Sequence, residues 1–232
     1  MSETTNDLRG IVARAVQVLT SLILEAGILF AGAGDFGWIW AWVFIGISVA
    51  SIAVIGTIMV TRSPGTIAER GHPGGGKNWD KWIAGLWGVF QFIIMPFIAA
   101  LDARLHWTAG FDLWLHIAGA AFYTLGLELF AWAMISNAYF STIVRIQSDR
   151  GHQVCRNGPY RYVRHPGYSG TILQSIGIPI LLGSVWALVP GFLAMILIVI
   201  RTTLEDRTLG VELEGYAEYM KGTQFRLLPG VW

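Results

Sequence analysis

Apolar runs of about the length of a bilayer crossing recur along this chain and leave little sequence between them. They cover residues 11–33, 38–60, 82–101 and 113–135, and a further apolar stretch covers residues 168–200. A helix needs about 20 apolar residues to cross a ~30 Å hydrocarbon core, where the backbone must satisfy its own hydrogen bonds. Because 54% of the residues are hydrophobic, the chain is predicted to be an all-α, polytopic membrane protein.

The last apolar stretch is too long for a single crossing. It contains 33 residues, and at ~1.5 Å rise per residue this exceeds a ~30 Å hydrocarbon core. Pro179, Gly183 and Pro190 interrupt it, so we expect a helical hairpin over residues 168–200 that turns near residues 183–186. Together with four spans in residues 1–135, the hairpin gives about six transmembrane helices.

Positive charge is distributed unevenly between the two sides of this arrangement. Of the 16 Lys and Arg residues, two (Arg9 and Arg14) lie just before or at the start of the first run, four lie in residues 61–81, five in residues 136–168 and four follow Ile200. Arg104 falls on the opposite side. Because cytoplasmic loops are enriched in Lys and Arg, we expect both termini and the polar loops to be cytoplasmic. The net charge of +1 gives no indication of nucleic-acid binding.

Three features of the N-terminal half have simple structural interpretations. The AGAG at residues 31–34 is compatible with a signal-peptide cleavage site, but the run before it exceeds the usual ~7–15 residue apolar core and contains Glu25. The sequence GAGDFG at residues 32–37 matches G-x-G-x-x-G, yet no strand precedes it, and we expect a tight turn. Glycines and prolines mark residues 61–82 as a loop.

The most polar segment lies between the fourth run and the hairpin. Residues 156–168 read RNGPYRYVRHPGY, and five arginines fall between Arg145 and Arg164 in a chain of which 13% is charged. Since apolar runs flank this segment, we place it at the cytoplasmic membrane edge. This concentration of charge predicts that the functional site is here.

A second polar segment follows the hairpin. Leu209, Leu213, Tyr216 and Met220 recur at steps of four, three and four residues, which predicts an amphipathic helix over residues 201–221. That helix would carry Arg201 and Glu205 on one face, because residues four apart are neighbours on a helix surface. It would therefore bring a cation and a carboxylate to the same membrane edge.

The residue types in the two segments suit a ligand with anionic and aromatic parts. Arginines bind carboxylates or phosphates, tyrosines stack on flat rings, and carboxylates accept hydrogen bonds from hydroxyl or amino groups. His152 and Cys155 form an H-x-x-C pair, but two candidate ligands without partners do not predict a metal site.

The order of motifs in these segments resembles one family of integral-membrane enzymes. The motifs are His152-Gln153-Val154, Gly158-Pro159-Tyr160 and Arg164-His165-Pro166-x-Tyr168, followed after the hairpin by Arg201 with Glu205-Asp206, Glu214-Gly215-Tyr216 and Arg226-Leu227-Leu228-Pro229-Gly230. Over about the last 85 residues the chain is similar to the isoprenylcysteine carboxyl methyltransferase family, which has phospholipid N-methyltransferases as relatives. The family commonly has Glu-Glu at the acidic pair, and this departure leaves the role of Asp206 open.

The resemblance implies a cofactor and a set of site residues. Within a single membrane domain, residues 136–232 would form the cofactor-binding, catalytic half, with S-adenosylmethionine as the cofactor and S-adenosylhomocysteine as its product. The implied cofactor contacts are His152, Val154, Gly158, Tyr160, His165, Pro166, Tyr168 and Glu205. Arg164, Arg201 and Glu205 are the implied catalytic residues, the two arginines as candidates for positioning the acceptor, and no metal is expected.

The resemblance also implies a lipid-like acceptor that reaches the site from the bilayer. An isoprenylcysteine-type carboxylate is preferred to the amine of a phospholipid. A carboxylate, with a reference pKa near ~4, is ionised at neutral pH and needs no base, whereas an amine must lose a proton, which Glu205 or a histidine would have to take. The sequence contains both sets of groups, so the residues themselves do not choose between the two acceptors. An NADPH-dependent reductase of the sterol-reductase type and a non-catalytic protein that keeps the pocket are the alternatives. The oligomeric state and the roles of Glu25 and Glu128 are left open.

Overall fold

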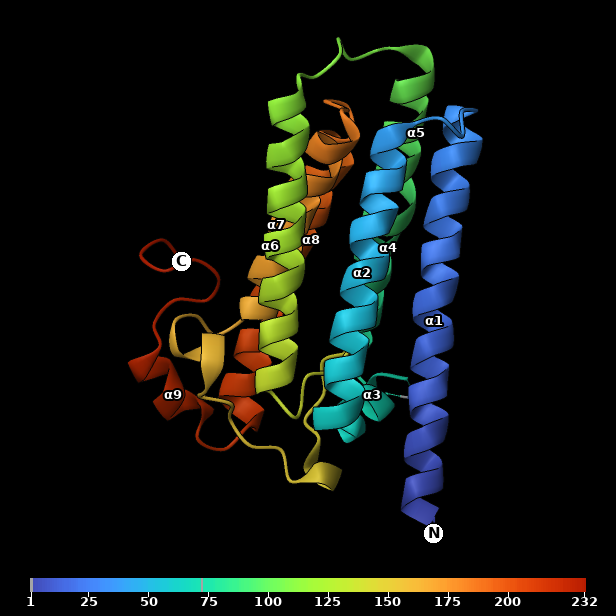
Figure 1. Ribbon diagram of the computed structural model, residues 1–232. Coiled ribbons are helices and arrows are strands. Elements are labelled where there is room, and N and C mark those ends of the chain that lie inside the picture. Colours follow the sequence, from blue (N-terminus) through green and yellow to red (C-terminus); the bar gives the residue numbers. More distant parts are fainter. Residues whose placement is uncertain (1, 72) are drawn as a thin grey trace.

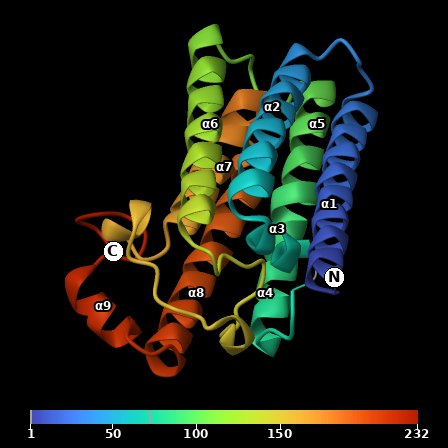
Figure 2. The same cartoon turned by 60° about the horizontal axis from the view of Figure 1, so that its bottom comes forward.

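Long helices that run side by side make up most of the molecule. The computed structural model describes residues 2–71 and 73–232, with side chains from residue 7 onward. The long elements are α1 (Ser2–Ala33), α2 (Ile39–Arg62), α4 (Asn78–Val89), the π-helical turn Phe90–Ile94, α5 (Met95–Leu105), α6 (Leu113–Ser136), α7 (Pro166–Leu182) and α8 (Leu188–Glu212). Figures 1 and 2 show the short helices α3 (Pro64–Gly71) and α9 (Tyr216–Gly222) at one end of this bundle. No strand occurs in the described ranges.

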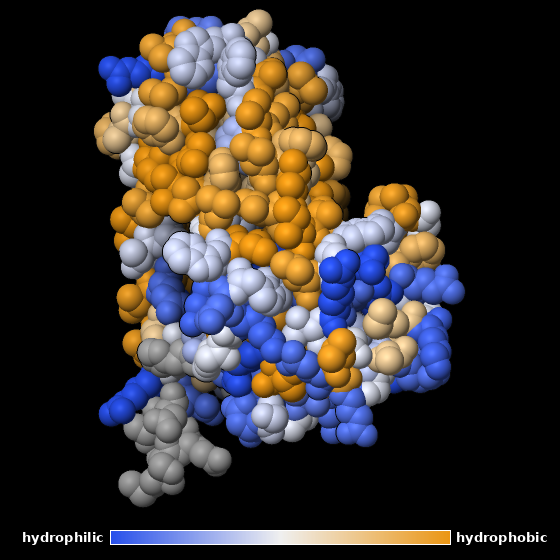
Figure 3. Space-filling view, turned by 180° about the vertical axis from the view of Figure 1, so that it is seen from behind, coloured by the Kyte–Doolittle hydropathy of each residue, from blue (hydrophilic) through white to orange (hydrophobic). Residues whose placement is uncertain are grey.

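The prediction of a polytopic, all-α membrane protein is confirmed. Five helical segments are long and apolar enough to cross a bilayer: residues 7–33, 39–62, 78–105, 113–136 and 188–212. The 17-residue α7 is shorter and forms a hairpin with α8 through a turn that begins at Gly183, where φ is +77°. Figure 3 shows a broad apolar surface over the helices and a polar surface at the end that carries α3 and α9.

The span that contains Pro96 remains continuous through a change in helix type. Proline has no N–H, and in an α-helix its ring clashes with the carbonyl four residues earlier. The five residues Phe90–Ile94 form a wider π-helical turn immediately before this position, and the α-helix resumes at Met95. As a result, residues 78–105 form one span of 28 residues.

Helices α6 and α7 lie in backbone contact because glycines face each other at their interface. A methyl group added to Gly126 would lie 2.6 Å from the carbonyl oxygen of Gly170, and one added to Gly177 would lie 2.4 Å from the backbone nitrogen of Tyr123. In a bilayer, where lipid tails are as apolar as the side chains, small residues of this kind permit the close packing that holds helices together. The contact fixes the positions where α6 ends and α7 begins, which are the two ends of the polar segment 137–165.

The prediction that residues 61–82 form a loop is wrong for part of its length. Helix α3 occupies Pro64–Gly71, and Pro64 is its first residue. Proline suits that position, since its fixed φ matches a helix and the first N–H groups have no partner within the helix. Thr66 Oγ1 donates to the carbonyl of Ala138 (3.1 Å), which attaches α3 to the loop that follows α6.

The predicted separate helix over residues 201–221 also differs from the structure. Helix α8 continues from the membrane span to Glu212 without a break. The chain leaves the helix at Leu213, which is extended, and Gly215 adopts a left-handed conformation with φ +79° before α9 begins. Glycine accepts this conformation without steric cost. The stripe from Leu209 to Met220 nevertheless packs as one apolar cluster across the break.

The turn predicted for GAGDFG is confirmed. Gly34 has φ +67°, and the side chain of Asp35 accepts a hydrogen bond from the N–H of Gly37 (2.7 Å). Gly34 and Gly37 therefore serve the connection between α1 and α2, while Gly32 is still in α1 and packs against Ala100.

Substitution of Gly126 by alanine tests the close contact between α6 and α7. We expect the variant to lose about 1–3 kcal/mol of stability, because its new methyl group overlaps backbone atoms that cannot move easily. The measurement is the thermal unfolding midpoint in detergent. Gly56→Ala on α2 is the matched control, since its methyl group would meet no described atom within 4 Å. Equal midpoints for the two variants would contradict the interpretation.

Candidate functional site

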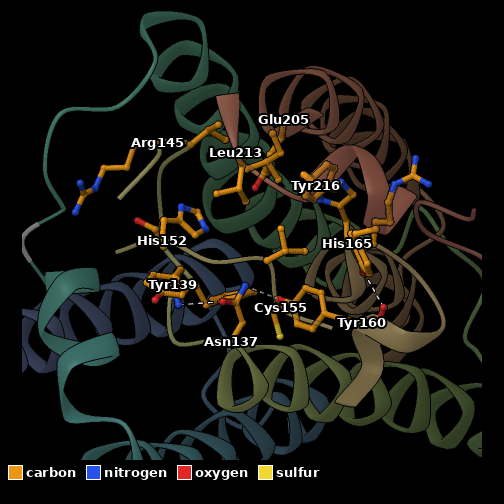
Figure 4. A pocket seen from close by; sticks show the side chains of 18 of the residues that line it. Asn137, Tyr139, Arg145, His152, Cys155, Tyr160, His165, Glu205, Leu213 and Tyr216 are labelled. Atoms are coloured by element: carbon orange, nitrogen blue, oxygen red, sulfur yellow. Dashed lines mark hydrogen bonds between the residues drawn. The ribbon is translucent and has the colours of Figure 1, made fainter. Parts of the chain in front are cut away.

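A pocket opens at the end of the bundle where α3 and α9 lie. Three parts of the chain line it: residues 137–145, which follow α6, residues 152–168, and residues 201–219 of α8 and α9. Figure 4 shows the side chains of His152, Tyr160, His165 and Glu205 around this space. Of the residues implied by the resemblance, His152, Val154, Tyr160, Arg164, His165, Tyr168, Arg201 and Glu205 line the pocket, whereas Gly158 and Pro166 do not.

The carboxylate of Asp206 is the centre of a buried polar network beside the pocket. Arg164 donates to both of its oxygens, from Nε and from Nη2, each at 2.8 Å. The hydroxyl of Tyr216 donates to Oδ1 (2.9 Å), His165 Nε2 lies 3.1 Å from the same oxygen, and Arg226 Nε donates to Oδ2 (2.8 Å). The Asp206 side chain is 1% exposed. Its role, left open by the sequence, is to join α8, the segment before α7 and the C-terminal tail.

The guanidinium of Arg164 is almost fully occupied within the protein. Besides its two bonds to Asp206, Nη1 donates to the carbonyls of Thr223 (2.8 Å) and Gln224 (2.6 Å). These are four hydrogen bonds for a group with five N–H donors. The backbone N–H of Arg164 also donates to the carbonyl of Phe225 (2.9 Å). In this arrangement Arg164 holds the C-terminal tail against the pocket.

Arg201 has its own buried carboxylate partner, Asp80 on α4. Its Nε and Nη2 donate to Asp80 at 2.7 and 3.1 Å, and Nη2 also donates to the carbonyl of Thr142 (3.0 Å). Asp80 is fully buried and accepts a further bond from the N–H of Val144 (2.7 Å). The guanidinium carbon of Arg201 lies 5.3 Å from the centre of the Tyr168 ring. Arg201 thus joins the third and last spans to the pocket wall, and its Nη1 has no hydrogen bond to the described residues.

Glu205 lines the pocket one turn beyond Arg201. The hydroxyl of Tyr168 donates to Glu205 Oε2, and Oε1 has no hydrogen bond to any described residue. Tyr168 also stacks on His165, with ring centres 5.8 Å apart and an angle of 9° between the planes. The half-buried Glu205 therefore offers one carboxylate oxygen to a ligand in the pocket.

The imidazole of His152 is held in its neutral form. Nδ1 accepts a hydrogen bond from the N–H of Gln147 (3.2 Å), so the neutral ring carries its proton on Nε2. Burial, followed by the positive charges of Arg145 and Arg150, lowers the pKa of His152 to about 4. The ring also packs against Tyr139, with centres 4.6 Å apart. At neutral pH His152 contributes a flat, uncharged N–H donor.

Arg145, the third arginine in the pocket lining, is paired as well. It contacts Asp149 and Glu69, each at 2.8 Å, and the hydrogen bond to Asp149 is the main cause that raises its pKa. Each of the three arginines of the pocket wall therefore has a carboxylate partner, whereas Glu205 forms no ion pair with a described cation.

Gly158 and Pro166 shape the backbone near the pocket. A methyl group on Gly158, where φ is +57°, would lie 2.2 Å from Ser136 Oγ, so glycine permits the close approach of this segment to the end of α6. Pro166 is the first residue of α7. Tyr160 follows Gly158 in a short 3-10 helix, is 7% exposed and accepts a hydrogen bond at its carbonyl from the Tyr219 hydroxyl (2.7 Å).

Sequence reasoning missed several residues that complete the site. Asp80, Asn137, Tyr139 and Tyr219 all line it or support its walls. Asp80 lies in a stretch predicted to be loop, and nothing in the sequence pairs it with Arg201, 121 residues away. The H-x-x-C pair makes separate contacts, because the Cys155 thiol donates to the carbonyl of Ser136 (3.1 Å). Within the described ranges, no three metal-ligating side chains cluster.

Comparison with known proteins confirms the family resemblance. Residues 120–211 match the model of the isoprenylcysteine carboxyl methyltransferase family. Two curated relatives, each named probable protein-S-isoprenylcysteine O-methyltransferase, come from Oryza sativa subsp. indica and subsp. japonica. Each is 37% identical over 43 residues, a segment that covers 18% of this chain and 22% of the relative. The matched family region contains the segments before and after the hairpin that line most of the pocket.

Substitution of Asp206 by asparagine tests the polar network. We expect the free energy of unfolding to fall by roughly 3–5 kcal/mol, because the change leaves buried cations without their negative partner. Asp149→Asn removes a carboxylate that is 61% exposed and should cost less than ~1 kcal/mol. Detergent unfolding measured on both variants compares the two sites. A loss for Asp206→Asn no larger than for Asp149→Asn would show that the network does not stabilise the fold.

The charge state of His152 is a second test of the site. An NMR titration of labelled histidine in detergent should give a midpoint near pH 4 for His152, so that the ring is neutral above that pH. Arg145→Gln should raise the midpoint, because it removes a nearby positive charge that opposes protonation. A wild-type midpoint near the ordinary value of ~6.5 would contradict the described environment.

Proposed function

We propose, from the family that residues 120–211 match, that this multi-pass membrane protein transfers a methyl group from S-adenosylmethionine to a lipid-like acceptor. The preferred acceptor is an isoprenylcysteine-type carboxylate, in line with the names of the two rice relatives. The observation that carries the proposal is the pocket that the matched segments form at the edge of the apolar helices.

The charge arrangement of the pocket supports a sulfonium cofactor. Such a cofactor, when bound, supplies an electrophilic methyl group, and it combines a positive sulfur with an aromatic base, hydroxyl groups and a single carboxylate. The pocket offers aromatic rings from Tyr139 and Phe140, a free oxygen on Glu205 and a neutral imidazole at His152. NADPH carries several phosphate charges and would require unpaired arginines, whereas the arginines of the pocket wall are already paired.

The residues implied by the resemblance divide into ligand contacts and supports. His152, Val154, Tyr160, His165, Tyr168 and Glu205 line the pocket and are proposed to contact the cofactor, while Gly158 and Pro166 are proposed to shape the backbone around it. Arg201 is proposed to face the acceptor through Nη1, and Arg164 to act by holding the C-terminal tail.

The proposed mechanism relies on positioning and on exclusion of water. A carboxylate acceptor is ionised at neutral pH, so no side chain has to remove a proton, and the pocket walls would orient the oxygen toward the methyl group. An amine acceptor would need a base near the methyl donor. Nδ1 of His152 already accepts a backbone hydrogen bond, whereas Oε1 of Glu205 is free to take a proton, so the preference for a carboxylate rests on the names of the two relatives.

The sidedness of the site is part of the proposal. The pocket lies at the end of the bundle where residues 61–81 and 136–168 are found, and Lys and Arg are concentrated in these two segments. By the positive-inside rule this end faces the cytoplasm, together with both termini.

Calorimetric titration of the detergent-purified protein with S-adenosylhomocysteine and with NADPH tests the cofactor. We expect S-adenosylhomocysteine to bind and NADPH not to bind. Glu205→Gln should weaken the binding about tenfold or more, because a hydrogen bond to a charged acceptor is worth ~1.5–3 kcal/mol. Glu218→Gln, an exposed change on α9, is the matched control and should have no effect. Binding of NADPH instead would replace the proposal with the reductase alternative.

A further inference from the structure

Arg70, on α3, is a buried cation without an anionic partner. The residue is 6% exposed. Among the described residues no carboxylate lies within ion-pair distance of its guanidinium, and none accepts a hydrogen bond from it. It differs in this respect from Arg145, Arg164 and Arg201, each of which has a carboxylate partner.

Two aromatic rings hold the guanidinium of Arg70 without using its N–H groups. Its central carbon lies 5.2 Å from the centre of the Phe140 ring and 5.7 Å from that of Phe130. The two rings are perpendicular, with centres 5.2 Å apart. Contact with ring faces stabilises a cation by ~0.5–2 kcal/mol but uses none of the five N–H donors of arginine.

The surroundings of Arg70 favour an anionic ligand. Burial, and then the positive charges of Arg14 and Arg201, lower the pKa of Arg70 to about 9, so the side chain is still charged at neutral pH. A buried charge that is not paired costs considerable free energy. Of the two neighbouring cations, Arg201 is paired with Asp80, while Arg14 donates to the uncharged side chain of Gln17.

Arg70 is fixed next to the pocket. The ring of Phe140, on which it lies, also lines the pocket. Two contacts immobilise α3: Thr66 Oγ1 donates to the carbonyl of Ala138 (3.1 Å), and Gln17 Nε2 of α1 donates to the carbonyl of Gly71 (3.1 Å). Arg70 does not itself line the pocket. Its guanidinium is held against a ring of the pocket wall, on a helix outside the segments that carry the family motifs.

We infer that Arg70 binds the carboxylate of the acceptor and selects for acceptors that carry one. The inference rests on the proposed function and adds a residue outside the segment that matches the family. An arginine can hold a carboxylate through two parallel hydrogen bonds, and its planar donors fix the direction of the oxygen that reacts.

The charge change of the reaction fits this role. The carboxylate oxygen forms the new bond to the methyl carbon, and the electron pair of the broken carbon–sulfur bond stays on sulfur. An anion and a sulfonium thereby become a neutral ester and a neutral thioether. The ester no longer pairs with Arg70, so the same contact that binds the substrate favours release of the product.

The test compares Arg70→Gln and Arg70→Lys with Arg62→Gln, an exposed arginine at the end of α2. The probes are an N-acetyl-S-prenylcysteine and its carboxamide, which has the same shape without the charge. We expect wild type to bind the carboxylate at least tenfold more tightly than the carboxamide. Arg70→Gln should abolish this preference and raise KM for the carboxylate at least tenfold with a smaller change in kcat. Arg70→Lys should keep part of the preference for the carboxylate, and Arg62→Gln should bind both probes as wild type does.

S-adenosylhomocysteine binding separates failure of this inference from failure of the proposed function. If wild type binds neither S-adenosylhomocysteine nor the acceptor, both are wrong. If S-adenosylhomocysteine binds normally but Arg70→Gln keeps the carboxylate preference, the role of Arg70 is wrong and the proposed function stands. A lower unfolding midpoint with the preference intact would make Arg70 a structural residue. If Arg70→Gln lost only its binding to anionic phospholipid vesicles, Arg70 would be assigned to a lipid phosphate and the inference would be wrong. Equal binding of the carboxylate and the carboxamide by wild type would also overturn the inference.

Discussion

The structure at the polar end of the bundle depends on buried charges that need partners. A carboxylate such as Asp206, with a 1% exposed side chain, is tolerated because two arginines, a histidine and a tyrosine surround it. Asp80 is likewise tolerated because it forms a buried ion pair with Arg201. Since the partners lie on α4, α8, the segment before α7 and the C-terminal tail, satisfying these charges also assembles the pocket. The packing of α6 against α7 through glycines fixes where that pocket begins, because the polar segment leaves one helix and enters the other.

The sequence was most informative where a single physical constraint acts over many residues. The thickness of the bilayer sets the length of each span, so the four N-terminal spans and the hairpin could be predicted from apolar runs alone. Local rules were less decisive. Pro64 looked like part of a loop and begins a helix, and α8 continues through Gly210 to Glu212, where a separate helix had been predicted. At these positions the intrinsic helix propensities leave helix and loop close in free energy, and tertiary contacts decide between them.

For the site, residue types were predictable and their pairing was not. The resemblance to the family's motifs implied eight residues that line the pocket, one of which, Val154, is apolar. Arg164 and Arg201 were expected to face an acceptor, yet most of the N–H donors of Arg164 and three hydrogen bonds of Arg201 serve the protein itself. A sequence shows that an arginine is present, whereas a structure shows how much of its hydrogen-bonding capacity is still free.

Free capacity is what separates Arg70 from the other arginines near the pocket. A site that must bind one cation and one anion together binds both best when the charges of its own walls are balanced. A strong net charge on the walls would hold one of the two substrates and repel the other. The paired arginines and neutral His152 meet this condition. In the proposed reaction, the unpaired Arg70 and the free oxygen of Glu205 would each hold one of the two charged substrates. Methyl transfer would neutralise both substrates at once, so both contacts would weaken in the same step.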